Sequence, residues 1–147
     1  MLSKPIHGWT NVTIGDFAGR ASYTTDVPMD CLMAFINALE YNIPASIFFD
    51  EEGTEFTLVA SFNYTYVIEE RQEPKLIIVN KRFLSLAKEL VNDIENNLED
   101  WVIWYDYYDG CDEEYKDMFD KRRIVLKERI SRLKELMKLD ENNLRLN

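Results

Sequence analysis

Short stretches of alternating hydrophobic and polar residues run along much of this chain, and other stretches repeat apolar residues at helical spacing. The clearest signal lies between Ile47 and Ala60, where two apolar runs flank the polar segment from Asp50 to Gly53. Glycine adopts positive φ without strain, and a polar loop of about three to five residues between apolar runs is typical of a β-hairpin. The pattern predicts a hairpin over residues 47–60, around which the core sheet forms.

Further strands are predicted on both sides of this hairpin by β-branched and aromatic residues. Trp9–Ile14 reads as a first strand, and residues 21–25 pair back after a turn as a short second strand. Residues 64–70 alternate in polarity, and residues 76–79 are all apolar. Because the connections are short, these segments predict an antiparallel meander of about five strands.

Apolar residues at helical spacing predict the first two helices. Residues 28–41 begin with Pro28, which suits a first helical position because proline has no N–H to satisfy there. One side of this segment is apolar, as in an amphipathic helix. Asn80 is a suitable N-cap for a second helix, whose apolar register extends to Leu98.

A third and longest helix is predicted from Asp112 to Leu139, and residues 140–147 are expected to form a frayed tail. Its apolar residues recur at steps of three and four and form a seam. This seam either lies across the sheet or makes a homodimer contact. The elements together predict a single α+β domain over residues 1–147, with the three helices mainly on one face of the sheet.

Charge narrows the class of partner. The chain carries a formal net charge of −10. Nucleic acid and anionic lipid attract proteins mainly through Lys and Arg, so an acidic chain favours a basic protein partner over either of them. No apolar run approaches the roughly 20 residues of a membrane span, no secretory signal is evident, and two cysteines make no disulfide framework. We therefore expect a soluble, cytoplasmic protein without membrane contact.

Residue types suited to catalysis or metal binding are scarce. His7 is the single histidine, and Cys31 and Cys111 lack the paired spacing of a zinc site. The acids at Asp106 and Asp109 do not follow the alternating spacing of a calcium loop, and no glycine-rich phosphate loop occurs. A carboxylate pair for glycoside hydrolysis stays open, because 27 acidic residues always permit some pair. We expect no enzyme activity, no catalytic residues, no metal and no cofactor.

Aromatic and acidic residues concentrate between Glu99 and Asp120, which hold two of the three tryptophans and four of the eight tyrosines. Aromatic residues are enriched at binding hot spots, and carboxylates around them steer a basic partner. In the alternative, structural interpretation, the aromatic residues cover the sheet edge and the second helix. The residues predicted to bind the partner are Trp101, Trp104, Tyr105, Asp106, Tyr107, Tyr108, Asp109, Asp112 and Glu113.

Two other charged groups have a functional and a structural interpretation. The tip of the hairpin is a negatively charged turn. In the functional interpretation it binds a partner, and in the structural interpretation it is a solvated turn that discourages sheet-edge aggregation. Basic residues gather between Lys121 and Lys138. They could bind RNA, but we expect them to form ion pairs with acidic residues elsewhere in the same chain. The secondary acidic patch at the hairpin tip consists of Asp50, Glu51, Glu52 and Glu55.

This chain is small, acidic and α+β, it lacks a catalytic set of residues, and its strand–Asp-Glu-Glu-Gly–strand hairpin follows a helix. In these respects it resembles bacterial immunity proteins of the polymorphic-toxin type. The resemblance implies a non-enzymatic inhibitor that binds and blocks a basic toxin domain. It concerns the overall character of the chain, so it assigns no role to any single residue.

Three other functions are compatible with the sequence. The first is a phage-encoded inhibitor of a host defence system that mimics the charge of nucleic acid. The second is a small-molecule-binding domain, in which an apolar pocket with a few polar groups is lined by Trp9, Tyr23, Tyr66 and Trp104. The third is a hydrolase that uses unrecognised carboxylates, which would need a buried pair with strongly perturbed pKa values.

Overall fold

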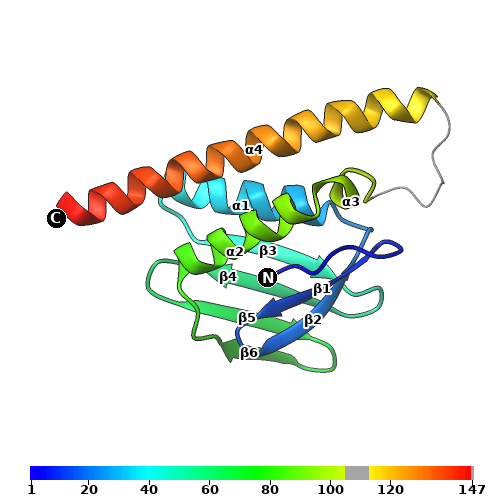
Figure 1. Cartoon of the computed structure of the whole chain (residues 1–147). Helices are drawn as coiled ribbons and strands as arrows, with labels where there is room; N and C mark the ends of the chain where they lie inside the picture. Colours follow the sequence, from blue (N-terminus) through cyan, green and yellow to red (C-terminus); the bar gives the residue numbers. More distant parts are fainter. Residues whose placement is uncertain (105–112, 147) are drawn as a thin grey trace.

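The computed structural model describes the backbone of residues 1–104 and 113–146, and the side chains of residues 1–104 and 115–142. These residues form an α+β fold, as predicted, in the order β-β-α-β-β-β-β-α-α-α (Figure 1). The strands are β1 (Trp9–Ile14), β2 (Phe17–Ser22), β3 (Ala45–Asp50), β4 (Glu55–Ala60), β5 (Thr65–Glu70) and β6 (Pro74–Ile78), and the helices are α1 (Val27–Tyr41), α2 (Phe83–Asn96), α3 (Leu98–Val102) and α4 (Glu113–Leu146).

The strands form two antiparallel sheets rather than a single meander. Strands β3 to β6 follow one another in a four-stranded sheet, while β1 and β2 pair only with each other. The ring of Phe17 in β2 packs against Phe56 in β4, with centroids 4.9 Å apart. The first hairpin therefore covers one face of the larger sheet instead of extending its edge.

Strand β2 begins earlier than the predicted residues 21–25, because the turn before it is tight. Ile14 pairs with Phe17 across this turn. Gly19 lies inside the strand, where a Cβ atom would stand only 2.5 Å from the ring of Phe56. Glycine is needed at this position for close packing, because Gly19 lies at the contact between the two sheets.

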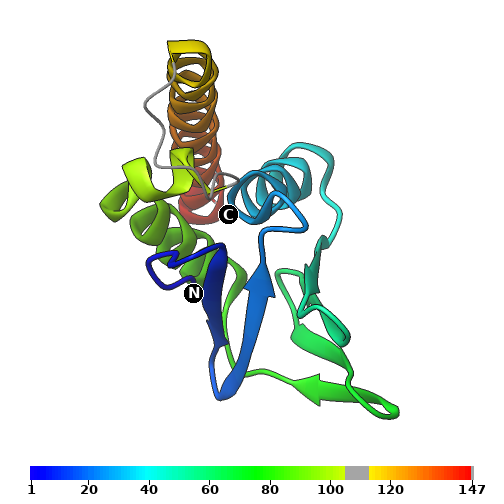
Figure 2. The same cartoon turned by 90° about the vertical axis from the view of Figure 1, so that its right-hand side faces the viewer.

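The helices lie on the same side of the four-stranded sheet as the β1–β2 hairpin (Figures 1 and 2). This arrangement confirms that the helices gather mainly on one face. Helix α1 covers the predicted segment and ends at Asn42, whose φ of 53° is left-handed. Helix α2 starts after Arg82 rather than at the predicted N-cap Asn80, and α3 is a separate short helix that the sequence did not predict.

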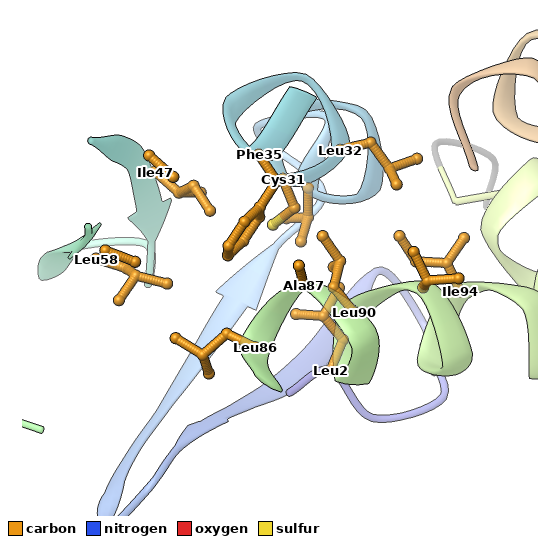
Figure 3. Packing of buried hydrophobic residues seen from close by; sticks show 14 of the residues in the cluster. Leu2, Cys31, Leu32, Phe35, Ile47, Leu58, Leu86, Ala87, Leu90 and Ile94 are labelled. Atoms are coloured by element: carbon orange, nitrogen blue, oxygen red, sulfur yellow. The ribbon is translucent and has the colours of Figure 1, made fainter. Parts of the chain in front are cut away.

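The core fills the space between α1, α2 and the covered face of the four-stranded sheet (Figure 3). Phe35 of α1 packs against Phe83 at the start of α2, with ring centroids 5.0 Å apart. Leu32 and Leu90 from the same helices are fully buried, as is Leu58 from β4. Removing such side chains from water, at about 25 cal/mol per Å² of apolar surface, is the main force that holds the layers together.

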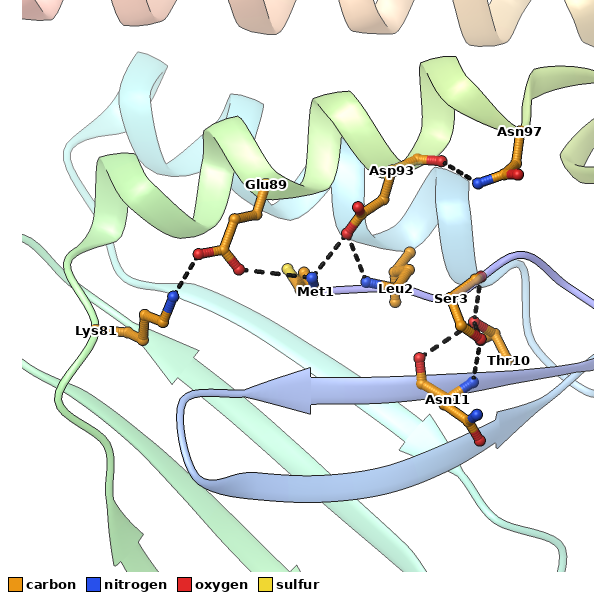
Figure 4. Close-up of polar contacts among 9 residues, drawn as sticks. All are labelled: Met1, Leu2, Ser3, Thr10, Asn11, Lys81, Glu89, Asp93 and Asn97. Atoms are coloured by element: carbon orange, nitrogen blue, oxygen red, sulfur yellow. Dashed lines mark hydrogen bonds and ion pairs between the residues drawn. The ribbon is translucent and has the colours of Figure 1, made fainter.

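Polar contacts attach the N-terminal segment to α2 and β1 (Figure 4). The carboxylate of Asp93 accepts a hydrogen bond of 2.8 Å from the backbone N–H of Leu2 and lies 2.7 Å from the amino group of Met1. The hydroxyl of Thr10 donates to the backbone carbonyl of Ser3 at 2.8 Å. These contacts hold the segment against the helix and bury Leu2 in the core.

Helix α4 continues to Leu146, past the predicted helix end at Leu139. Leu136 and Met137 are buried, and Lys88 of α2 pairs with Glu141 of α4. These contacts continue past the predicted helix end, because α2 runs alongside this part of α4.

The apolar seam of α4 packs inside the chain. Leu126, Ile130 and Leu133 are buried, and α4 contacts α1, α2 and α3. The residues that suggested a homodimer contact are therefore used within one copy of the protein. Among the described residues, no helix is both long enough and apolar enough to cross a membrane.

Candidate functional site

The face of the four-stranded sheet that points away from the helices carries a row of exposed apolar side chains. Along β3, β4 and β5, buried residues alternate with partly or fully exposed ones, as expected for strands with one covered face. We call the uncovered side the outer face. Its side chains are Ser46, Phe48, Asp50, Glu55, Thr57, Val59, Tyr66, Ile68, Glu70, Pro74, Leu76 and Ile78.

Strand register arranges these side chains in rows across the sheet. Phe48, Thr57, Ile68 and Leu76 are paired in succession and form the middle row. Phe48 is 44% exposed, Leu76 is 58% exposed and Ile78 in the next row is 77% exposed. Exposed apolar patches rimmed by polar groups mark interaction sites in soluble proteins. No described element lies against this side of the sheet (Figure 2).

An acidic row borders the apolar residues at one end of the sheet. Asp50 pairs with Glu55, and Glu55 pairs with Glu70, so three adjacent strands each contribute a carboxylate. A hydrogen bond with Glu70, burial and the nearby negative charges raise the pKa of Glu55. Within the described part of the chain, neither Glu55 nor Glu70 forms an ion pair with a basic side chain. We call Asp50, Glu55 and Glu70 the acidic row.

The secondary acidic patch predicted at the hairpin tip divides into two parts. Asp50 and Glu55 belong to the acidic row, and Glu52 is exposed at the turn with a φ of 56°. Glu51 is instead drawn into an ion pair, in which the guanidinium of Arg71 donates two hydrogen bonds of 3.1 Å. Burial alone would raise the pKa of Glu51, but hydrogen bonds from Arg71 and a backbone N–H outweigh it and lower the pKa.

Trp101 and Trp104 lie in the core rather than on a binding surface. Their exposed fractions are 0% and 3%, and their rings pack together with centroids 5.0 Å apart. The indole N–H of Trp104 donates to the backbone carbonyl of Thr25 at 3.1 Å. In this structure both side chains therefore take the structural role that the sequence left as the alternative.

The rest of the predicted aromatic and acidic site lies outside the described residues. Glu113 begins α4, although its side chain is not among those described. The predictions for Tyr105, Asp106, Tyr107, Tyr108, Asp109 and Asp112 therefore stay predictions.

Several basic residues of α4 pair with acids of the same chain, as expected. Arg122 makes two hydrogen bonds of 2.8 Å with the carboxylate of Asp26, at the start of α1. Arg123 binds Glu99 of α3, and other basic residues of α4 bind acids of α1 and α2. These pairs attach the helix to its neighbours and leave less free positive charge for RNA.

The four aromatic residues proposed for a small-molecule pocket do not meet. Tyr66 lies on the outer face and stacks with Tyr64, whereas Trp104 is buried on the helical side of the sheet. Trp9 lies beneath the guanidinium of Arg20, 4.8 Å from it. The structure therefore does not form the pocket that the sequence suggested.

Neither a reactive thiol nor a metal-binding cluster is formed within the described residues. Cys31 is fully buried on α1, and burial together with nearby carboxylates raises the pKa of its thiol, which favours the unreactive protonated form. No cluster of histidine, cysteine and carboxylate residues in the described ranges has the geometry to hold a metal ion.

The outer face is the part of the site that sequence analysis missed. The available signal was the all-apolar segment 76–79, because a strand with both faces apolar either is buried on both sides or exposes an apolar surface. A second signal was Phe48 beside Phe49, which places one ring on each face of β3.

No protein-family model, curated protein or solved structure matches this chain.

Proposed function

We propose that this protein is a non-enzymatic binding protein that neutralises a basic protein partner, in the manner of a toxin-immunity inhibitor. The observation that supports the proposal best is the outer face, an uncovered apolar sheet surface bordered by the acidic row. The apolar rows supply contact area, and the acidic row supplies charge complementarity to a basic surface. We also propose that the protein acts in the cytoplasm.

The combination of apolar and acidic rows favours a protein over a nucleic acid as the partner. A mimic of nucleic-acid charge needs carboxylates spread along a surface in place of phosphates. Here the acids form one border, and the centre of the face is occupied by Phe48, Ile68 and Leu76. Apolar side chains of a partner protein match such a centre, and its lysine and arginine side chains match the border.

A comparative capture experiment tests the proposal. The wild-type protein and two variants are immobilised at low salt and exposed to the same lysate of the source cells. The face variant carries Phe48→Lys and Leu76→Lys. The matched control carries Tyr41→Lys and Ile43→Lys, which add the same charge at side chains that are 68% and 50% exposed at the α1–β3 connection. Circular dichroism checks that all three proteins are folded.

We expect one basic protein to bind the wild type and the control and to be lost from the face variant. Because the charge attraction is screened by salt, the association rate should also fall as ionic strength rises. Equal capture by the face variant and the control would contradict the proposal, and so would an association rate that does not change with salt.

A further inference from the structure

Strand β6 is an open edge of the four-stranded sheet. The strand order places β3 and β6 at the two edges. The edge at β3 is protected, because β2 and α1 contact that strand. On β6, Leu76 and Ile78 are exposed to 58% and 77%. Proteins usually protect such edges with lysine, proline, bulges or covering elements, since an uncovered edge pairs readily with another strand. Strand β6 carries Pro74 and Lys75 at its start, but its second half, residues 76–78, has neither.

The backbone groups of β6 that point outward can be assigned from the register. The N–H of Val79 donates to the carbonyl of Thr65 in β5 at 2.9 Å. In an antiparallel ladder the hydrogen-bonding residues alternate, so Ile77 faces β5 and Leu76 and Ile78 direct their N–H and C=O groups away from it. The backbone of Pro74 also faces away from β5, so its missing N–H removes no hydrogen bond from the sheet. Among the described residues, none bonds to these outward groups.

We propose that the basic partner contributes an extended segment that pairs with β6 as an added antiparallel strand. The inference rests on the proposed function, because the acidic row is what makes the segment basic. A strand in this position continues the rows of the outer face. Its first and third residues lie beside Ile78 and Leu76 and are apolar, and its fifth lies beside Pro74 and is arginine or lysine. The small proline ring lets this cationic side chain extend toward Glu70, the carboxylate of the acidic row nearest to β6.

Backbone pairing distinguishes strand addition from simple surface docking. The third residue of the added strand lies opposite Leu76, and both its N–H and its C=O bond to that residue. The N–H of the fourth residue points away from β6. Methylation of the backbone nitrogen therefore removes a bond to β6 at the third position and no bond to β6 at the fourth.

Capped extended peptides with valine at the first and third positions, threonine at the second and fourth, and arginine at the fifth provide the test. Amide resonances of the full chain are followed by NMR as each peptide is added, to about 5 mM. We expect shifts at Leu76 and Ile78, and binding weakened about fivefold by N-methylation at the third position but not at the fourth. Replacing arginine by neutral citrulline should weaken binding about threefold, and Glu70→Gln should abolish this difference.

Protein variants provide an independent check of the same geometry. Leu76→Pro removes one outward N–H, and Leu76→Val keeps it while also shortening the side chain. We expect the proline variant to bind the unmethylated arginine peptide about fivefold more weakly than the valine variant does, because the lost N–H donates to the C=O of the third residue, while N-methylation at that residue should weaken binding to both variants. Equal binding of the two N-methylated peptides, or no binding of the arginine peptide, would overturn strand addition.

These outcomes are separate from those that test the proposed function. If lysate capture of a basic protein is lost from the face variant but kept by Leu76→Pro, the outer face binds its partner without strand addition. If capture does not depend on the outer face at all, the proposed function itself fails.

Discussion

Replacement of Trp104 by alanine tests whether the tryptophans of the aromatic and acidic segment belong to the core. The side chain is 3% exposed, packs on Trp101 and donates a hydrogen bond to Thr25. Truncation of a buried tryptophan costs about 3–5 kcal/mol, and the unpaired carbonyl adds about 1 kcal/mol. Because the free energy of unfolding of small domains is about 5–15 kcal/mol, Trp104→Ala should lose a large share of the total stability.

Urea unfolding followed by far-ultraviolet circular dichroism measures this loss. Trp104→Phe keeps most of the apolar contact but cannot donate to Thr25, so its cost should be smaller, at about 1–2 kcal/mol. Ile103→Ala is the matched control, because Ile103 is the adjacent residue and is 47% exposed; a cost below about 1 kcal/mol is expected there. A similarly small cost for Trp104→Ala would refute the assignment of this indole to the core.

Three further predictions concern the sheets and the acidic row. Gly19→Ala should cost about 1–3 kcal/mol in urea unfolding, because the added methyl group meets Phe56, and the cost should shrink in a Phe56→Leu background; a neutral result would contradict the packing. Glu51 has a lowered pKa, so its stabilising contribution is complete above its ordinary pKa of 4.5 and is lost as pH falls through the lowered value. Urea unfolding from about pH 6 to about pH 3 should therefore show a smaller loss of stability in Arg71→Met than in the wild type. Glu70→Gln should raise the thermal midpoint at neutral pH in scanning calorimetry, because it removes one of the facing carboxylates, and a lower midpoint would contradict repulsion within the acidic row.

Local patterns in the sequence were sufficient for most of the fold. The hairpin at 47–60 was predicted because a polar turn with Gly53 separates two apolar runs, and β3 and β4 pair as that pattern requires. Helix α1 was predicted by its apolar spacing and Pro28. The placement of the β1–β2 hairpin was not predictable, because it depends on the contact between Phe56 and Gly19, which lie far apart in the sequence.

The candidate site was harder to predict, because it is made by register and not by local sequence. Asp50 and Glu55 are neighbours across one hairpin, but Glu70 joins them only when β5 pairs with β4. Composition drew attention instead to the segment around Trp101, where aromatic residues are dense but have no clear period. Density of aromatic residues does not distinguish a core from a binding surface, and in this chain the two tryptophans of the segment are buried.

The outer face combines two features that each destabilise the isolated protein. Carboxylates directly opposite each other, such as Glu55 and Glu70, repel one another, and exposed apolar side chains such as Leu76 and Ile78 remain in contact with water. A basic partner with an apolar contact surface would relieve both costs in one event, by placing positive charge against the acidic row and burying the adjacent rows. The same partner would pair the outward backbone groups of β6. One class of ligand would thus satisfy the charges, the apolar area and the open edge together, and we therefore assign all three to a single interface.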